Sequence, residues 1–194
     1  MSATGLLLAA GAGRRFGGGK LLSPLDGQPL ALHALVTLHT VVDQVLAVTR
    51  PGDDELLALL QRAGASVTVC PDADAGMGAS LAWGAARAPR GPLVVALADM
   101  PRVRTDSLHR VIAGLDAAHP IAVPRYRGEP GHPVAFADAV RPALLSCGGD
   151  RGARHLITDP AWPVRWVEVD DPGVRIDVDT PQALTAVEAG PAPT

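Results

Sequence analysis

Residues 6–20 read LLLAAGAGRRFGGGK, an apolar run followed by a loop with five glycines and three basic residues. The run at residues 6–9 predicts a buried strand, because short apolar segments bounded by glycine are typical of strands covered on both faces. Glycine costs conformational entropy on folding but lets a backbone approach a ligand closely. Backbone N–H groups in such a loop bind anions, and the side chains of Arg14, Arg15 and Lys20 neutralise phosphate oxygens. We therefore expect a phosphate group at this loop.

The loop is similar to two well-known phosphate-binding motifs and matches neither. A Walker A loop requires Ser or Thr after its lysine, whereas Leu21 follows Lys20 in this chain. The dinucleotide fingerprint requires glycine three residues after Gly13, where this chain has Phe16. The alternative to a phosphate site is a flexible surface loop with solvated arginines, and the position of the loop directly after a strand argues against it.

Further apolar runs alternate with helical patterns along the chain, which is typical of a mostly parallel sheet with helices on both faces. The other expected strands cover residues 45–49, 66–69, 93–98, 121–123, 133–136 and 164–167. The expected helices cover residues 30–40, 53–63, 79–88 and 104–118. These patterns predict a Rossmann-like three-layer α/β/α fold with a mixed, mostly parallel sheet. No composition shift marks a second domain, so we expect a single domain over residues 1–190 and a frayed, proline-containing tail at residues 191–194.

The composition excludes several classes of partner. A net charge of −3 and a pI near 6.0 provide no basic surface of the kind that nucleic-acid binding needs. Cys70 and Cys147 form no CxxC pair, so neither a disulfide framework nor a zinc site is expected, and the compartment is expected to be reducing. The N-terminal apolar run has no basic segment before it, is broken by glycine and is too short to span a bilayer. We expect a cytoplasmic protein without nucleic-acid or membrane partners.

A single acidic residue ends the apolar run in LVVALADMP, residues 93–101. Asp99 follows what reads as a fully buried central strand, which Pro101 then breaks. Ligands of open α/β sheets lie beyond the carboxyl ends of the strands, so we expect this carboxylate in the same crevice as the glycine-rich loop. Mg²⁺ suits the position, because proteins usually hold this ion with one or two carboxylates together with substrate phosphates. The alternative role is a helix cap, but the predicted helix begins near Thr105, six residues further on, where Thr105 or Asp106 would serve better.

The segment RIDVDTPQAL, residues 175–184, places two aspartates before a Thr-Pro helix start. Thr180 as N-cap and Pro181 at the first helical position predict the beginning of a helix. This structural explanation does not account for the aspartates. Asp179 is the preferred second carboxylate of the metal site, and Asp177, two residues away on the same strand face, is the alternative.

Five motifs, in chain order and spread over nearly the whole sequence, carry a family resemblance: LAAGAGRRFGGGK, LADMP, PGHPVAF, GDRGARHL and DVDTPQAL. Together they resemble the nucleotidyltransferases related to molybdenum cofactor cytidylyltransferase. The resemblance implies a nucleotide-binding α/β fold of the glycosyltransferase-A type and dependence on Mg²⁺. It implies transfer of CMP from CTP to the phosphate of molybdopterin, with release of pyrophosphate. A molybdoenzyme or a chaperone would be the protein partner that receives the finished cofactor.

The same resemblance assigns roles to individual residues. The residues that would act in catalysis are Lys20, Asp99 and Arg14. The residues that would bind the nucleotide are Leu8, Ala9, Ala10, Gly11, Gly13 and Lys20. The metal ligands would be Asp99 and Asp179. The residues that would lie on the cofactor side are His132 and residues 150–154, including Arg151 and Arg154; a turn role for the histidine and solvation of the arginines are the alternatives.

The implied reaction also makes chemical sense for these residue types. A phosphate monoester has a second pKa of about 6, so the acceptor is already an oxyanion at neutral pH and needs no general base. The reaction needs in-line positioning and neutralisation of the charge that builds on the α-phosphate and the leaving pyrophosphate. Lys20, Arg14 and a Mg²⁺ ion on Asp99 and Asp179 would supply both.

Details of the first motif favour CTP over GTP. Guanylyltransferases of this superfamily typically read LAGG and place Asp before the lysine, whereas this chain reads LAAG and has Gly19. Sugar-phosphate and polyol-phosphate nucleotidyltransferases usually have proline there. The alternatives are a guanylyltransferase or another nucleotidyltransferase that acts on a different small phosphorylated acceptor.

Two further alternatives come from other functional classes. A nucleotide sensor would keep the fold and bind without turnover, but it would not need the lysine and the two carboxylates. A serine hydrolase could use Ser80 in GMGASLAWG, yet its motif requires glycine two residues after the serine, where Ala82 stands. In the family resemblance, this GMGAS segment belongs to the substrate cleft instead.

Overall fold

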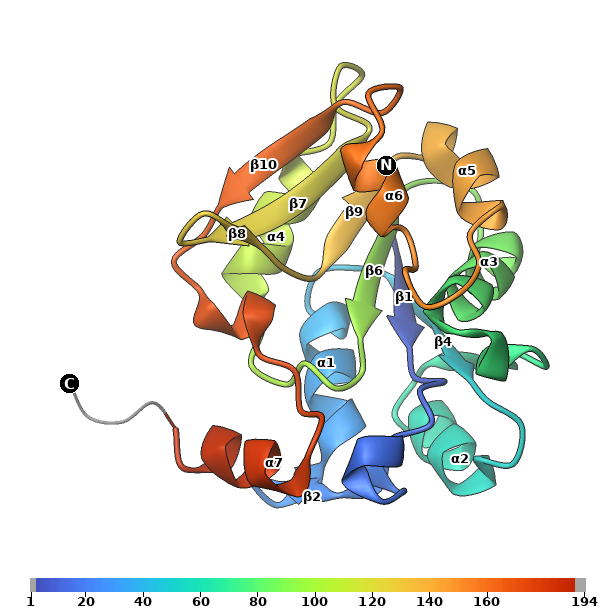
Figure 1. Cartoon of the computed structure of the whole chain (residues 1–194), viewed down its shortest axis with the longest axis vertical. Helices are drawn as coiled ribbons and strands as arrows, with labels where there is room; N and C mark the ends of the chain where they lie inside the picture. The colour runs from blue at the N-terminus through green and yellow to red at the C-terminus, as the bar shows by residue number, and fades with distance from the viewer. Residues whose placement is uncertain (1–2, 191–194) are drawn as a thin grey trace.

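The apolar run of the opening motif forms β1 (Thr4–Leu8), which is buried along its whole length between two parallel neighbours (Figure 1). Leu6 and Leu8 face one hydrophobic core, and Leu7 faces the other. Because both faces of the strand are apolar and covered, the predicted buried strand is confirmed. The computed structural model describes residues 3–190, and the predicted frayed tail at residues 191–194 lies outside them.

Within residues 3–190, one sheet of eight strands carries the fold, in the order β10-β7-β9-β6-β1-β4-β5, with β8 paired to β7. The other strands are β4 (Gln44–Thr49), β5 (Ser66–Val69), β6 (Leu93–Leu97), β7 (Ile121–Tyr126), β8 (Glu129–Pro130), β9 (Val134–Phe136) and β10 (Val164–Glu168). β9 runs antiparallel to β6 and β7, and β8 runs antiparallel to β7. The remaining pairs are parallel, so the predicted mixed and mostly parallel sheet is confirmed.

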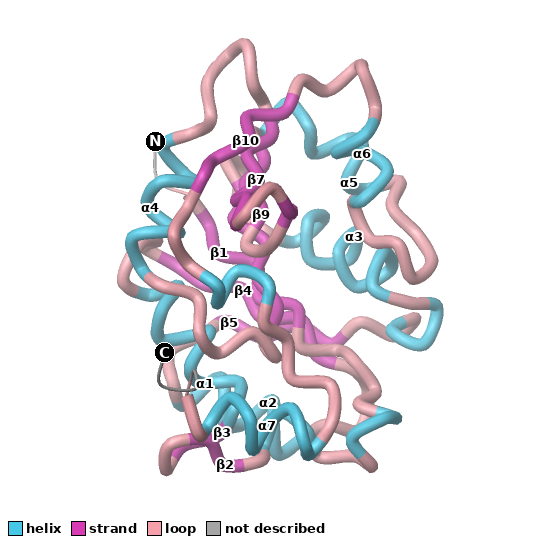
Figure 2. Tube along the Cα trace, turned by 60° about the vertical axis from the view of Figure 1, so that its left-hand side comes forward, coloured by secondary structure: helices cyan, strands magenta, loops and turns pink. Residues whose placement is uncertain are grey.

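Helices cover both faces of the sheet and complete the predicted three layers. The helices α1 (Leu30–His39), α2 (Asp54–Arg62) and α4 (Thr105–Ala113) bury their apolar residues in one core. The helices α3 (Met77–Arg87), α5 (Arg141–Leu145) and α6 (Arg154–Thr158) bury theirs in the other. Figure 2 shows α3, α5 and α6 together on one side of the strands, with α4 on the opposite side. None of the helices within residues 3–190 has both the length and the apolar character that a membrane span requires.

Some elements differ from the prediction. The helix predicted over residues 104–118 ends at Ala113, because the Asp116 carboxylate accepts the backbone N–H groups of Ala118 and His119 and forms a turn. The two-stranded hairpin of β2 (Pro24–Leu25) and β3 (Gln28–Pro29) and the short helices α5 and α6 were not expected.

The helix start predicted at the C-terminal Thr-Pro pair is confirmed. Thr180 is the N-cap of α7 (Pro181–Glu188), and its hydroxyl oxygen accepts the N–H of Ala183. Figure 1 shows α7 beside the β2–β3 hairpin, far in sequence but near in space. Arg102 joins the two, because its guanidinium contacts Asp26 at 2.6 Å and donates to the carbonyl of Val187.

Arg141 is a buried cation that closes the C-terminal end of α3. Its guanidinium donates to four backbone carbonyls, those of Ala85, Ala88, Pro89 and Gly91. Its Nε also donates to Asp138 Oδ1 at 2.8 Å. This hydrogen bond is the main reason why the pKa of Asp138 lies below its usual value. Because the last carbonyls of a helix have no partner within the helix, Arg141 supplies the donors that the end of α3 and the following turn need.

Replacement of Arg141 by alanine should lower the free energy of unfolding by about 3 kcal/mol, because buried carbonyls lose their donor. Equilibrium unfolding in urea measures this loss. Arg90→Ala is the matched control, because Arg90 is exposed and lies 3.5 Å from the same Asp138 carboxylate. The control should cost less than about 1 kcal/mol. Equal losses in the two variants would contradict the structural role of Arg141.

Candidate active site

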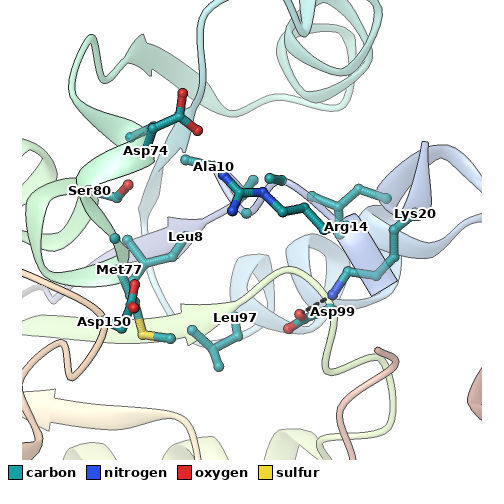
Figure 3. Close-up of a pocket in the computed structure, with 16 residues that line it drawn as sticks. Leu8, Ala10, Arg14, Lys20, Asp74, Met77, Ser80, Leu97, Asp99 and Asp150 are labelled. Atoms are coloured by element: carbon teal, nitrogen blue, oxygen red, sulfur yellow. Dashed lines mark hydrogen bonds and ion pairs between the residues drawn. The ribbon is translucent and has the colours of Figure 1, made fainter. Parts of the chain in front are cut away.

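The carboxyl ends of β1 and β6 lie side by side, since Leu8 and Leu97 are paired in the register. Beyond these strand ends, the glycine-rich loop and the start of α3 enclose a cleft of about 250 Å³ (Figure 3). Most of the residues that we expected to bind the nucleotide line it, namely Leu8, Ala9, Ala10, Gly11 and Lys20, and so do the predicted catalytic residues Arg14 and Asp99. Gly13 lies elsewhere and lines a second hollow, about 460 Å³, that shares Gly11 and Lys20 with the first.

The glycine-rich loop needs its glycines for its backbone shape. Gly17, Gly18 and Gly19 have φ angles of 91°, 97° and 63°, in the region that residues with a Cβ rarely adopt. The loop turns back on itself as the N–H groups of Phe16 and Gly18 donate to the carbonyl of Gly13. This turn delivers Lys20 to the interior of the site, where it is 8% exposed.

Lys20 brings together the two predicted metal ligands. Its Nζ atom lies 2.6 Å from Asp99 Oδ2 and 3.3 Å from Asp179 Oδ1, and Figure 3 shows the lysine reaching Asp99. A backbone hydrogen bond also joins the two segments that carry the carboxylates, because the N–H of Val178 donates to the carbonyl of Asp99 at 2.9 Å. Segments that are 79 and 159 residues away from Lys20 in sequence therefore meet at one ammonium group.

Arg15 is a site residue that was predicted only as one of the basic residues of the loop, whereas Arg14 was predicted to act in catalysis. Its guanidinium lies 2.6 Å from Asp179 Oδ2, whereas Arg14 reaches over the cleft (Figure 3). Both oxygens of Asp179 thus contact a cation, one from Arg15 and one from Lys20. Two adjacent arginines in a loop give no signal of which points where, because the loop conformation decides it.

Asp177, the alternative metal ligand, lies close to the same cluster. Partial desolvation first, and then the negative charges of Asp179 and Asp99, raise the pKa of the Asp177 carboxyl group above its usual value. It contacts neither Lys20 nor Arg15 in the way that Asp179 does. The geometry therefore favours Asp179 as the partner of Asp99.

His132 does not line the cleft, but it lies close enough to Asp99 for the charge of that carboxylate to act on its imidazole. The pKa of the imidazole is lowered, mainly because the ring is buried. The positive charge of Arg154 lowers it further, whereas the negative charge of Asp99 opposes the shift. Its backbone N–H donates to the carbonyl of Val174 at 2.8 Å. Among the residues that the structure describes, no partner is found for its buried Nδ1 atom. The structure thus brings His132 near one predicted metal ligand, Asp99, and near Arg154.

The loop that carries Arg151 and leads to Arg154, the first residue of α6, lies against the N-terminal end of α3. Neither arginine lines the cleft, but Asp150, the residue directly before Arg151, does. Gly78 N–H donates to the carbonyl of Gly149 at 2.8 Å, and a Cβ at Gly78 would lie 2.5 Å from the Gly148 backbone. Glycine at this position therefore permits the close contact that places Asp150 on the cleft.

The GMGAS segment contributes cleft residues that were expected only as a segment, Met77 and Ser80 among them. Ser80 lies within α3 and is 4% exposed, so it does not occupy a sharp turn from a strand into a helix. A serine nucleophile requires that turn, and the hydrolase alternative is therefore excluded for Ser80. Asp74, which also lines the cleft and pairs with Arg50 at 3.0 Å, had no motif to identify it.

A family model described as the MobA-like NTP transferase domain matches residues 5–166. The chain belongs to this family. The purine catabolism protein PucB of Bacillus subtilis (strain 168) is 33% identical over 199 residues, which cover 94% of each chain. The nicotine blue oxidoreductase of Paenarthrobacter nicotinovorans is 32% identical over 93% of this chain and 94% of its own.

A relative named for molybdenum cofactor chemistry and a solved structure support the same family assignment. The molybdenum cofactor guanylyltransferase of Burkholderia vietnamiensis (strain G4 / LMG 22486) is 43% identical over 60% of this chain and 58% of its own. Rv0371c from Mycobacterium tuberculosis H37Rv superposes with a TM-score of 0.88 at 30% identity, covering 98% of both chains. The same protein is also known as a complex with manganese, with a TM-score of 0.82. The predicted resemblance is confirmed, and this MobA-like protein is a nucleotidyltransferase.

In this MobA-like transferase, Gly78→Ala should detach the loop at residues 148–151 from α3, because the new methyl group would overlap the Gly148 backbone. Trypsin should then cut after Arg151 about tenfold faster, since cleavage follows the population of the opened loop. The control is Gly148→Ala, because no atom lies within 4 Å of a Cβ built there. A similar cleavage rate in both variants would contradict the proposed close contact.

Proposed function

We propose that this MobA-like transferase moves CMP from CTP to the phosphate of molybdopterin and releases pyrophosphate. The observation that carries the proposal is the meeting of Lys20 with Asp99 and Asp179 beside the cleft. A cation and two carboxylates next to an anion-binding loop suit a metal-bound triphosphate. The guanylyltransferase relative supports molybdenum cofactor as the class of acceptor.

Asp99 and Asp179 fit a divalent ion, with Mg²⁺ proposed. Their oxygens converge on one ammonium group, so a single cation can contact both carboxylates. Within residues 3–190, no cluster of three or more His, Cys, Asp or Glu side chains forms a complete metal cage, and Mg²⁺ typically takes its other ligands from water and phosphate. When bound, the ion supplies charge neutralisation at the triphosphate. The manganese complex of the mycobacterial relative supports a divalent ion at a site of this family.

The side chains of this protein would do the remaining work by binding and orienting. Lys20 and Arg14 would neutralise phosphate oxygens, and the N–H groups of the glycine-rich loop would hold the triphosphate in line. Arg151 and Arg154 are proposed to bind the phosphate of the acceptor, which is already an oxyanion at neutral pH. Burial lowers the pKa of His132, which does not line the cleft; we propose that it acts beside Asp99 without direct contact with the acceptor.

CTP is proposed as the nucleotide, because Ala10 and Gly19 occupy positions where guanylyltransferases of the superfamily typically have Gly and Asp. Residues 8–11 line the cleft largely with backbone and small side chains. A base edge would therefore be read mainly by N–H and C=O groups, and each group left unpaired by the wrong base costs about 1–3 kcal/mol.

The decisive experiment supplies the purified protein with Mg²⁺, molybdopterin and each of the four nucleoside triphosphates in turn. Pyrophosphate release and transfer of labelled nucleotide are measured together. We expect transfer from CTP at least about tenfold faster than from GTP, which corresponds to one mispaired group. A preference for GTP would refute the cytidylyl assignment and leave nucleotidyl transfer standing. Binding of nucleotide without pyrophosphate release would support the sensor alternative.

Lys20 holds the two carboxylates in the same way that a metal ion would. Because the ammonium group occupies the space between them, a divalent ion has to displace it before contacting both. The triphosphate offers the displaced lysine a new anionic partner. We therefore infer that metal and nucleotide bind cooperatively, the nucleotide drawing Lys20 away from the carboxylates.

Lys20→Ala should weaken CTP binding yet strengthen binding of Mn²⁺ alone by about tenfold, or roughly 1.4 kcal/mol, because a competing cation is removed. Titration of Mn²⁺ followed by electron paramagnetic resonance, without nucleotide, measures the second effect. Arg14→Ala is the control, because Arg14 lines the cleft and forms no ion pair with these carboxylates among residues 3–190. It should weaken CTP binding only. Unchanged or weaker Mn²⁺ binding by Lys20→Ala would contradict the displacement model.

A further inference from the structure

Asp171 is a buried carboxylate outside every motif considered above. It is 2% exposed, and both of its oxygens accept hydrogen bonds. Oδ2 accepts the N–H of Arg104 at 2.9 Å and the hydroxyl of Ser107 at 2.7 Å. Oδ1 accepts the N–H of Gly173 at 2.9 Å. A charged group this deeply buried is tolerated only when such donors replace water, so the carboxylate fixes all three groups relative to one another.

Two of those donors belong to the beginning of α4. Arg104 is the N-cap of this helix and Ser107 lies in its first turn. The first N–H groups of a helix have no partner within the helix, and a carboxylate placed there also interacts favourably with the helix dipole. The sequence predicts a capping side chain at Thr105 or Asp106, but the carboxylate that accepts hydrogen bonds at this end of the helix is Asp171, 67 residues away from Arg104. A cap from a distant segment ties that segment to the helix.

The segment tied in this way is residues 170–179, which we call the strap. It passes from Asp171 to Asp179 along the carboxyl end of the sheet, with contacts at several points. Gly173 packs so closely on the Arg102 carbonyl that a Cβ would lie 1.9 Å from it. Val174 accepts the N–H of His132, and Val178 donates to the carbonyl of Asp99.

The two proposed metal ligands are therefore held by two segments that Asp171 joins. Asp99 lies on the segment that leads from β6 into α4, and Asp179 lies at the far end of the strap. Chelation by two carboxylates requires that both be held at a fixed separation before the ion binds. The hydrogen bonds of Asp171 fix the start of the strap on the same helix that follows Asp99.

We propose that Asp171 is a positioning residue of the metal centre, which it stabilises without contacting the ion. The proposal rests on the proposed function only in taking Asp99 and Asp179 as the ligands. Outer partners of metal ligands typically change affinity by about 10–100-fold when removed. Loss of the Asp171 contacts would let Asp179 move away from Asp99 while the glycine-rich loop keeps its own structure.

The test measures binding of Mn²⁺ alone by electron paramagnetic resonance, and binding of CTP in the absence of metal by fluorescence. Asp171→Asn should raise the Kd for Mn²⁺ by about tenfold. Ser107→Ala, which removes one donor and keeps the charge, should raise it less, and it keeps the proposal testable if the first variant does not fold. CTP binding without metal should stay at the value of the unmodified protein in both variants.

Asp138→Asn is the matched control. Asp138 is another carboxylate that accepts an arginine and a backbone N–H, but it belongs to the turn before α5 and contacts neither the strap nor α4. This variant should lose stability without losing Mn²⁺ affinity. Unchanged Mn²⁺ binding in folded Asp171→Asn and Ser107→Ala, or an equal loss in Asp138→Asn, would overturn the positioning role. Absence of Mn²⁺ binding by the unmodified protein would instead refute the proposed metal centre itself, and the positioning role with it.

Discussion

The ammonium group of Lys20 is nearly buried, and it is stable there because Asp99 and Asp179 neutralise it. The reverse dependence holds as well, since two carboxylates at close range repel each other unless a cation lies between them. The three segments that carry Lys20, Asp99 and Asp179 are therefore held together by the mutual neutralisation of these charges. In the proposed displacement model, a divalent ion would take the place of this ammonium group, so metal binding would require Lys20 to move.

The sheet order explains how residues so distant in sequence reach this point. β1 lies between β6 and β4, so the glycine-rich loop and the Asp99 segment leave the sheet from neighbouring strands. β9 is inserted antiparallel between β6 and β7, which places His132 at the carboxyl end of the parallel strands just before β9 begins. The strap then crosses from β10 at one edge back to Asp99. Ligands of a parallel sheet bind beyond the carboxyl ends of its strands, and here the segment before the antiparallel β9 and the strap that follows β10 both reach that end.

Much of this arrangement could be predicted from the sequence, because long apolar runs and residues directly after them carry strong signals. The buried β1, the position of Asp99 and the Thr180 cap are of this kind. Helices of five residues such as α5 and α6 are too short to show a period, so they could not be predicted. The direction of each arginine in the loop depends on positive φ angles at several glycines. Asp171 carries no motif at all, since its partners Arg104 and Ser107 become neighbours only after folding.

The choice of nucleotide is hardest to predict for a related physical reason. The cleft wall at residues 8–11 consists of Leu, two Ala and Gly, so the groups that can recognise a base are mostly N–H and C=O groups common to every residue. One methyl group, such as that of Ala10, changes the position of those groups without changing their chemistry. Relatives can therefore bear names as different as purine catabolism protein, 33% identical over 94% of this chain, and guanylyltransferase, 43% identical over 60% of it. Selectivity in such a site would therefore depend on how residues such as Ala10 and Gly19, together with the packing of α3 and the glycine-rich loop, position the backbone around the cleft.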